Sequence, residues 1–324
     1  MSGSSIPYHL RHNKAIDRNL FMDLLARVGR FRNISDYRYI GFGGPFLEDF
    51  KSIHASLRLT KMVSIESDEN VGRRQEFNKP LSCVEITRQT SAEFVAEFDF
   101  YEDCIVWLDY TEPSKVGEQL AELEALVAKL QSGSVFKITL NAAAAALGNS
   151  PPGRDLQEFR AERAARLLGD YGPAVISTEE VTSKYYPRLL LQAIEAAAKR
   201  GVTGRNGYIV LPLTCFSYSD GQTMLAVSGI VLRKTEEPNF MRDTRLDHWD
   251  FTAVDWKDLK EISVPAMSIK ERIFVESMLP SSDGEEIGDA MGFHFASDED
   301  ESNRLLSNFA KYYRMYPWYS KVAV

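Results

Sequence analysis

The chain has 324 residues, of which 44% are hydrophobic and 26% charged, and its formal net charge at pH 7 is −8. This composition is typical of a globular protein, and the length suits one large domain with appendages or two modest ones. The excess of acids disfavours broad, charge-driven binding of nucleic acid. No run is long and apolar enough for a membrane span, and the first residues lack a signal peptide's apolar stretch. We therefore expect a cytoplasmic protein without a membrane partner.

The three cysteines, Cys83, Cys104 and Cys215, lie far apart and form no CxxC pair. This spacing disfavours both a zinc site and a disulfide framework. Each cysteine falls in a segment that we expect to be a strand. We therefore predict three reduced thiols and no metal.

Residues 1–12 are polar, and the apolar positions of residues 13–29 repeat as on one face of a helix. Basic residues, among them His12, gather on the arm and on the other face of this helix. Two interpretations stay open: a solvated helix face, or a basic lid over a negatively charged ligand.

Residues 39–66 show the pattern of a nucleotide-binding βαβ unit. A short apolar run at 39–42 leads into a glycine turn, and residues 46–57 then repeat at helical spacing. A second apolar run, 62–65, ends on Glu66. In such units the turn lets the backbone approach a ligand, and the terminal carboxylate accepts hydrogen bonds from ribose hydroxyls.

The glycines of this turn are Gly41, Gly43 and Gly44, and Phe46 stands where the NAD fingerprint requires a third glycine. The relaxed pattern is similar to that of class I S-adenosylmethionine (SAM) methyltransferases. That resemblance implies that the three glycines lie under the methionine part of SAM and that Glu66 holds its ribose. The alternative is an α/β protein whose glycine turn serves only packing.

Residues 69–77 are predicted to form a helix, and residues 83–87 a third strand. A helix beginning at Ser91 follows. In class I methyltransferases the loop after the third strand borders adenine, so the resemblance makes Thr90 and Ser91 candidate adenine contacts. Ser91 as a helix cap is the alternative.

The continuous apolar run at 104–108 is typical of a central parallel strand, and it ends in Asp109 and Tyr110. Open α/β sheets bind ligands at the carboxyl ends of such strands. Asp109 is therefore our first candidate for the reaction centre, and Tyr110 would stack on the acceptor or donate a hydrogen bond to it. Capping of the next helix is the alternative role for Asp109.

A helix at 115–130 and a fifth strand at 135–140, which ends in Asn141, continue the alternation. Asp109 and Asn141 together suggest a divalent-ion site, but two oxygen ligands are too few to define one.

Residues 142–175 are rich in small residues and turns and indicate an insertion, and residues 186–200 predict a helix. Two β-rich runs, 208–217 and 223–233, flank a hairpin turn. The expected fold is α/β: a doubly wound, mostly parallel, seven-stranded sheet ending in an antiparallel hairpin.

The expected division is an N-terminal arm and helix (1–30), a methyltransferase-like domain (31–234) and a C-terminal accessory region (235–324). Within the accessory region, the acidic stretch 283–301 is expected to be a mobile, solvated loop. We expect a docked helix after it.

The sequence also resembles a bacterial family described as O-methyltransferases. The matching motifs are YHLRHNKAIDRNLF, YIGFGGPFLEDF, MVSIESDENVGRRQEFN, IVWLDYTEP and KITLNA, which span roughly residues 6–142. The resemblance implies SAM as cofactor, and such families are associated with mobile or anti-phage gene clusters.

The expected function is methyl transfer from SAM to an oxygen acceptor, with Asp109 or His12 as the base. The alternative is a non-catalytic nucleotide-binding or scaffold subunit of a defence or modification system, and a dehydrogenase is a third reading. Small molecule, protein and RNA all remain open as acceptors. A homo-oligomer and an operon-encoded protein partner remain open as assemblies.

Overall fold

The computed structural model of the protein describes residues 11–317. These residues group into two compact units. One unit comprises Met22–Ser217 and Gln222–Lys260. The other comprises the described residues up to Phe21, then Tyr218–Gly221 and the described residues from Glu261 onward. Residues 1–10 of the predicted arm lie outside the described residues.

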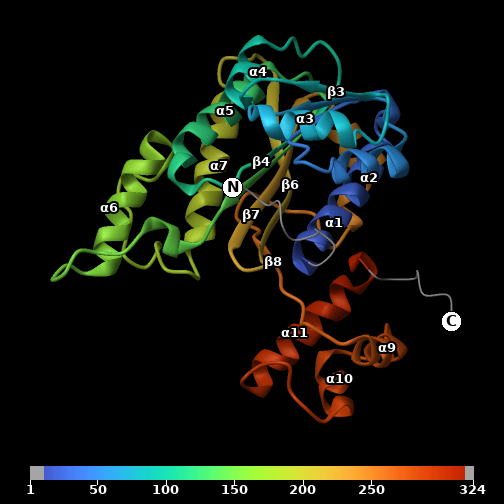
Figure 1. Ribbon diagram of the computed structural model, residues 1–324, viewed down its shortest axis with the longest axis vertical. Helices are drawn as coiled ribbons and strands as arrows, with labels where there is room; N and C mark the ends of the chain where they lie inside the picture. The colour runs from blue at the N-terminus through green and yellow to red at the C-terminus, as the bar shows by residue number, and fades with distance from the viewer. Residues whose placement is uncertain (1–10, 318–324) are drawn as a thin grey trace. The chain divides into compact units, whose positions relative to one another are not determined.

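A single mixed sheet organises the first unit (Figure 1). The strand order is β3-β2-β1-β4-β5-β7-β6-β8. Neighbouring strands from β3 to β5 are parallel, and β7 runs antiparallel to β5. The strands are β1 (Arg38–Gly41), β2 (Lys61–Ile65), β3 (Val84–Thr87), β4 (Cys104–Asp109), β5 (Val135–Asn141), β6 (Tyr208–Ser219), β7 (Thr223–Arg233) and β8 (Lys260–Ile262). The predicted α/β class, parallel sheet and closing hairpin are confirmed, and the short β8 extends the seven expected strands.

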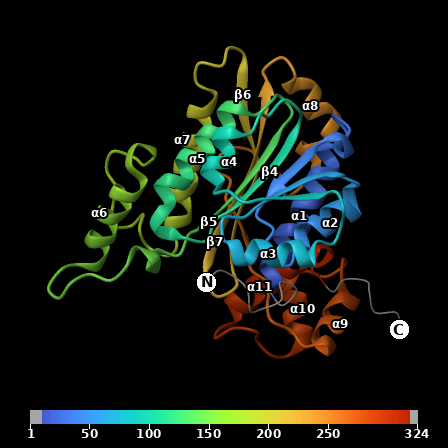
Figure 2. The same cartoon turned by 45° about the horizontal axis from the view of Figure 1, so that its top comes forward.

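Helices cover both faces of the sheet (Figures 1 and 2). One face carries α2 (Glu48–Leu57) and α3 (Glu69–Asn78), and the other carries α4 (Ser91–Glu97), α5 (Val116–Lys129) and α7 (Tyr186–Val202). In the predicted insertion, α6 (Leu156–Leu168) lies beyond α5 and α7, away from the sheet. After β7 the chain forms α8 (Glu237–Thr244). The crossovers thus produce the doubly wound arrangement.

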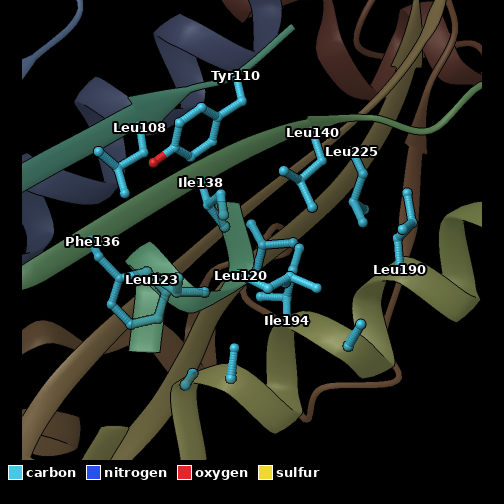
Figure 3. Close-up of a cluster of buried hydrophobic side chains, with 14 of the residues drawn as sticks. Leu108, Tyr110, Leu120, Leu123, Phe136, Ile138, Leu140, Leu190, Ile194 and Leu225 are labelled. Carbon is cyan, nitrogen blue, oxygen red and sulfur yellow. The ribbon is translucent and has the colours of Figure 1, made fainter. Parts of the chain in front are cut away.

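The main hydrophobic cluster fills the space between the sheet and the α5–α7 layer (Figure 3). Every second residue of β4 and β5 points into it, because successive side chains of a strand lie on opposite faces of the sheet. Side chains of α5 and α7 meet them at helical spacing. The labelled members include Leu108, Phe136, Ile138 and Leu140 from the strands and Leu120, Leu123, Leu190 and Ile194 from the helices.

The opposite face of the central strands is buried but partly polar. Lys137 of β5 is 1% exposed, and its Nζ lies 4.2 Å from the centroid of the Trp107 ring on β4. The Nε1–H of Trp107 donates to Thr139 Oγ1 at 3.0 Å. Burying a lysine is costly without compensating contacts, and the cation–π contact is one of them.

The cysteines are reduced thiols, as predicted. Cys104 begins β4 and Cys215 lies in β6, and burial raises the pKa of each to about 12. Cys83 precedes β3, which begins at Val84, so its expected place in a strand is wrong by one residue.

The second unit contains α9 (Ile269–Met278), α10 (Gly284–Met291) and α11 (Glu299–Tyr312). The expectation of a loop over the acidic stretch is therefore wrong for α10 and for the start of α11. Asp283 and Asp298 cap these helices, and acids occupy their first turns. Negative charge at a helix N-terminus is stabilising, so the acidic run favours helix starts.

The same unit contains the start of α1 (His12–Val28), which is capped from the β6–β7 turn. The carboxylate of Asp220 accepts from the backbone N–H of Lys14 at 2.8 Å and from that of Asn13 at 3.3 Å. The hairpin turn thus satisfies backbone donors that a helix end leaves unpaired. No helix within residues 11–317 combines the length and apolarity that crossing a bilayer requires.

Candidate functional site

The strand order reverses between β1 and β4, which lie side by side in the sheet although β2 and β3 separate them in sequence. Open α/β sheets bind ligands outside the carboxyl ends of the strands at such a switch point. Gly41, the last residue of β1, is in register with Trp107, and β4 extends two residues further to Asp109. The glycine turn and Asp109 therefore flank the switch point.

The glycine turn is held by a chain of three hydrogen bonds. Gly43 N–H donates to Ser64 Oγ at 3.2 Å, and that hydroxyl donates to Gln75 Oε1 at 3.1 Å. Gln75 Nε2 then donates to the carbonyl of Gly44 at 2.9 Å. Ser64 and Gln75 are fully buried. Sequence reasoning missed both. Ser64 within the apolar run 62–65 is a signal for such a network, whereas Gln75 lies between Arg74 and Glu76 and gives none.

Two of these glycines are also required by the backbone geometry. A Cβ on Gly43 would lie 2.2 Å from Leu47 Cδ2 and 2.6 Å from Ser64 Oγ, closer than atoms can pack. Gly44 has a φ of 50°, where glycine is favoured. Gly43 therefore lets the turn pack closely against Leu47 at the start of α2 and against Ser64 of β2. This is the packing role that the sequence analysis gave as the alternative to ligand binding.

The first turn of α2 carries two acids, Glu48 and Asp49. In dinucleotide-binding proteins the corresponding helix N-terminus receives a pyrophosphate. Two carboxylates at that point repel a phosphate, so the electrostatics favour a ligand without one.

Glu66 follows β2 at the same edge of the sheet. Its backbone N–H donates to the Thr87 carbonyl at 3.1 Å, and its Oε1 accepts from the N–H of Asp68 at 2.8 Å. Burial raises the pKa of the Glu66 carboxyl above its ordinary value, and the nearby Asp68 carboxylate adds to the shift. The N–H of Asp68 and the positive charge of Arg88 act in the opposite direction. Glu66 is thus a half-buried acceptor group whose charge depends on its neighbours.

Arg88 is a residue that sequence reasoning missed. It directly follows β3, and its Nη1 donates to the carbonyl of Glu69 at 3.0 Å. A Cβ on Gly72 of α3 would lie 1.7 Å from the same nitrogen. The guanidinium therefore lies on the backbone of α3, in space that Gly72 leaves free.

Thr90, not Ser91, is the N-cap of α4. Its hydroxyl accepts from the N–H of Glu93 at 3.2 Å, while Glu93 Oε2 accepts from Thr90 in return. This capping box places the cap one residue earlier than the alternative stated above. Ser91 occupies the first helical position, beside Tyr110. The predicted adenine contacts of Thr90 and Ser91 stay predictions.

Tyr110 turns into the hydrophobic cluster, beside Leu108 and Ile138 in Figure 3. Only 9% of the residue is exposed, and its hydroxyl donates to Glu122 Oε2 at 2.6 Å. Burial and the Glu122 carboxylate raise the pKa of the phenol well above its ordinary value. Tyr110 is engaged with α5, and its predicted contact with an acceptor stays a prediction.

Asp109 does not cap the following helix. The side chain of Glu112 caps the short 3₁₀ helix at Pro113–Lys115, and α5 begins directly after it. The alternative role for Asp109 is therefore wrong, and its predicted role at the reaction centre stays a prediction.

Asn141, the other residue of the suggested divalent-ion site, uses its side chain within the protein. Its Nδ2 donates to Gln222 Oε1 at 3.0 Å, and its Oδ1 accepts from the N–H of Ala143 at 3.1 Å. Within residues 11–317, no three His, Cys, Asp or Glu side chains gather as a metal site would require.

His12 lies in the second unit, where its ring centroid is 5.0 Å from that of Tyr316. Burial lowers the pKa of His12, the Asp220 carboxylate opposes this shift, and the Arg272 guanidinium adds to it. Its predicted role as a base stays a prediction.

Comparison with solved structures finds low-identity likenesses to proteins solved with S-adenosyl-L-methionine or SAH bound. LepI in complex with SAH and a substrate analogue shares 11% identity at a TM-score of 0.34, with 61% of this chain and 43% of that chain covered. Trm1 from Pyrococcus horikoshii with S-adenosyl-L-methionine shares 12% identity at a TM-score of 0.44, with coverage of 69% and 57%. The plantazolicin methyltransferase BpumL in complex with a monoazolic desmethylPZN analog and SAH shares 14% identity at 0.40, with coverage of 68% and 86%.

The chain thus spans less than two thirds of LepI and of Trm1. Identities and TM-scores this low carry no inference about activity. Comparison with curated proteins finds no match. A family model, in contrast, matches residues 6–324, which is nearly the whole chain. The chain therefore belongs to the family described as "Putative O-methyltransferase".

Proposed function

We propose that this protein is a SAM-dependent methyltransferase that acts on an oxygen acceptor. The observation that carries the proposal is the placement of the glycine turn, Glu66 and Asp109 on one edge of the sheet around the switch point. The family membership supports it. The acids at the start of α2 favour SAM over a dinucleotide, because SAM carries a sulfonium and no phosphate.

The polar groups at this edge are of the kinds that could bind the nucleoside part of SAM. Glu66 presents a carboxylate, the usual acceptor for vicinal ribose hydroxyls. On this proposal, Thr90, Ser91 and the backbone of the loop after β3 would border adenine. The turn from Gly41 to Gly44 would then lie beside the methionine part.

SAM, when bound, supplies a methyl group on a sulfonium. The protein's contribution to such a transfer is to align donor and acceptor and to exclude water. Glu66 would orient the ribose. Asp109 would accept the proton of the acceptor hydroxyl, and it is held at the end of a rigid, buried strand.

Titration with S-adenosylhomocysteine (SAH) tests the cofactor assignment. We expect SAH to raise the melting temperature of the protein and NAD to leave it unchanged. Glu66→Gln keeps the shape of the side chain but removes its charge, so the SAH shift should fall sharply. Glu85→Gln, an exposed substitution on β3, is the matched control and should behave as wild type. No shift with SAH in the wild type would refute the cofactor assignment.

A non-catalytic nucleotide-binding or scaffold role is the second candidate. The observation that favours it is that Thr90, Tyr110 and Asn141 all use their polar side chains within the protein. Asp109→Asn separates the two candidates. In an enzyme this variant keeps SAH affinity and loses methyl transfer, measured with radiolabelled SAM and a cell extract as acceptor source. In a non-catalytic subunit the wild type binds SAH and transfers no methyl group.

A further inference from the structure

Helix α6 carries two half-buried arginines, Arg160 and Arg163, one turn apart on the same flank. Arg166, one turn further along, is exposed. The buried face of the helix belongs to the main hydrophobic cluster and consists of Ala161, Ala164 and Leu168. The two arginines directly precede Ala161 and Ala164 in the sequence, so the fold holds their side chains partly away from water.

Both side chains reach the same backbone position, Gly148. The Nε–H of Arg160 donates to the Gly148 carbonyl at 3.1 Å. A Cβ on Gly148 would lie 3.1 Å from Nη1 of Arg163, so the second side chain lies against the same residue. Gly148 has a φ of 93°, in the region that favours glycine. Two guanidinium groups therefore lie against one residue of the loop after β5.

This loop connects the arginines with the carboxyl edge of the sheet. It follows Asn141 at the end of β5 and contains the 3₁₀ helix η4 (Ala144–Leu147), which ends at Gly148. Helix η4 contacts both α6 and the 3₁₀ helix η3 (Pro113–Lys115), which begins four residues after Asp109. The arginine pair is thus joined, through η4, to the segment that follows the proposed base.

The two arginines have no counter-charge within residues 11–317, where neither makes an ion pair. No acid lies three or four positions from either of them along α6. Of the acids in this segment, Asp155 caps the helix and Glu162 pairs with Arg154. Glu158 is exposed in the first turn.

This arrangement is unfavourable for the isolated protein. Like charges one turn apart destabilise a helix, and a cation held partly away from water without a counter-charge loses hydration. A bound anion would offset both costs. The donors to receive it are present, because Arg163 makes no hydrogen bond within the described residues and Arg160 uses only its Nε–H.

We propose that Arg160 and Arg163 bind a phosphate monoester group of the methyl acceptor. This inference rests on the proposed function and names the class of its acceptor, a phosphorylated hydroxyl compound. The planar guanidinium fork matches the oxygens of a phosphate and binds them bidentately. A phosphate monoester carries nearly two negative charges at pH 7, which match two guanidinium groups, whereas a carboxylate carries one.

The first experiment measures phosphate binding without SAM, so its result does not depend on the proposed function. Methyl phosphate is titrated with the full-length protein at pH 7.5 and constant ionic strength, and binding is followed by ³¹P NMR. We expect Arg163→Met to weaken this binding about tenfold, because charge-assisted hydrogen bonds are lost. Arg163→Lys keeps the charge without the fork and should recover part of the affinity. Acetate at equal concentration should displace little of the methyl phosphate.

Arg166→Met is the matched control. It removes an exposed arginine of the same helix, one turn from Arg163, and should bind methyl phosphate as wild type does. Arg163 is the better residue to replace than Arg160, because the Arg160 side chain also holds the Gly148 carbonyl. Circular dichroism and melting curves confirm that each variant is folded.

The second experiment tests the acceptor. A cell extract is treated with alkaline phosphatase, the phosphatase is inactivated, and the extract is offered with radiolabelled SAM. We expect wild type to transfer methyl groups to mock-treated extract and to lose this transfer on phosphatase-treated extract. Arg163→Met should transfer less to the mock-treated extract and bind SAH as wild type does, because the arginine acts on the acceptor and not on the cofactor.

The outcomes are distinguishable. Absence of methyl phosphate binding in wild type, or equal binding in wild type and Arg163→Met, overturns the phosphate site. Acetate that displaces methyl phosphate as well as unlabelled phosphate does overturns the choice of phosphate over carboxylate. Transfer that persists on phosphatase-treated extract overturns the acceptor class. Absence of SAH binding in wild type overturns the proposed function, and the ³¹P titration then still decides whether the two arginines bind phosphate.

Discussion

Replacing Tyr110 by phenylalanine removes the hydroxyl that donates to Glu122 and also interacts with Ser91, and it leaves the packing of the ring intact. The edge contact with Phe42, whose centroid lies 5.4 Å away, and the burial beside Leu108 are retained. The change is the loss of the 2.6 Å bond from the hydroxyl to Glu122 Oε2. Hydrogen bonds to charged groups contribute about 1.5–3 kcal/mol. Because Glu122 is only partly buried and water can hydrate it, we expect a loss near the lower end, about 1.5 kcal/mol.

Urea unfolding followed by tryptophan fluorescence measures this loss. Three of the four tryptophans, Trp107, Trp249 and Trp256, lie in the unit that contains Tyr110. Tyr186→Phe is the matched control, because burial alone raises the pKa of that phenol to about 12. It should change the free energy of unfolding much less. A double-mutant cycle with Glu122→Gln then isolates the pair. Equal losses in Tyr110→Phe and Tyr186→Phe, or an additive cycle, would refute the assignment of the energy to this hydrogen bond.

Three further predictions follow from the same contacts. The raised pKa of Tyr110 means that the folded state binds its proton more tightly than the unfolded state. Its contribution is complete below about pH 10, the unfolded value, and declines at higher pH. The stability difference between wild type and Tyr110→Phe, measured by urea unfolding, should therefore shrink above that pH, and a constant difference would contradict this. Gly43→Ala should lower the free energy of unfolding by about 1–3 kcal/mol, because its Cβ would lie 2.2 Å from Leu47 Cδ2; an unchanged urea midpoint would rule out this close packing. Asp220→Ala should lower the free energy of unfolding by about 1 kcal/mol, because the N–H of Lys14 loses its cap. Asp220→Asn keeps an acceptor oxygen and should lose less in the same urea assay, and equal losses in the two variants would argue against capping.

The sequence determined the strands of the sheet and which residues follow their carboxyl ends, the edge at which we propose that a ligand binds. The continuous apolar run at β4 indicates burial on both faces, and glycines and carboxylates after the apolar runs mark the carboxyl ends of parallel strands. The hairpin of β6 and β7 follows from two β-rich runs on either side of an Asp-Gly turn. Strands and turns depend on residues that are close together in the sequence, so the sequence pattern is enough to predict them.

Only the tertiary structure decided which polar groups face the ligand edge and which serve the fold. Tyr110 follows Asp109 directly, yet its hydroxyl reaches α5, and Thr90 is taken up by its own helix. Lys137 is buried although it looks like a strand residue facing solvent. The Arg88 guanidinium lies on the backbone of α3 because Gly72, sixteen positions earlier, leaves room for it. Spacing along the chain predicts where a side chain starts, but its partner is set by strand order and packing between residues far apart in sequence.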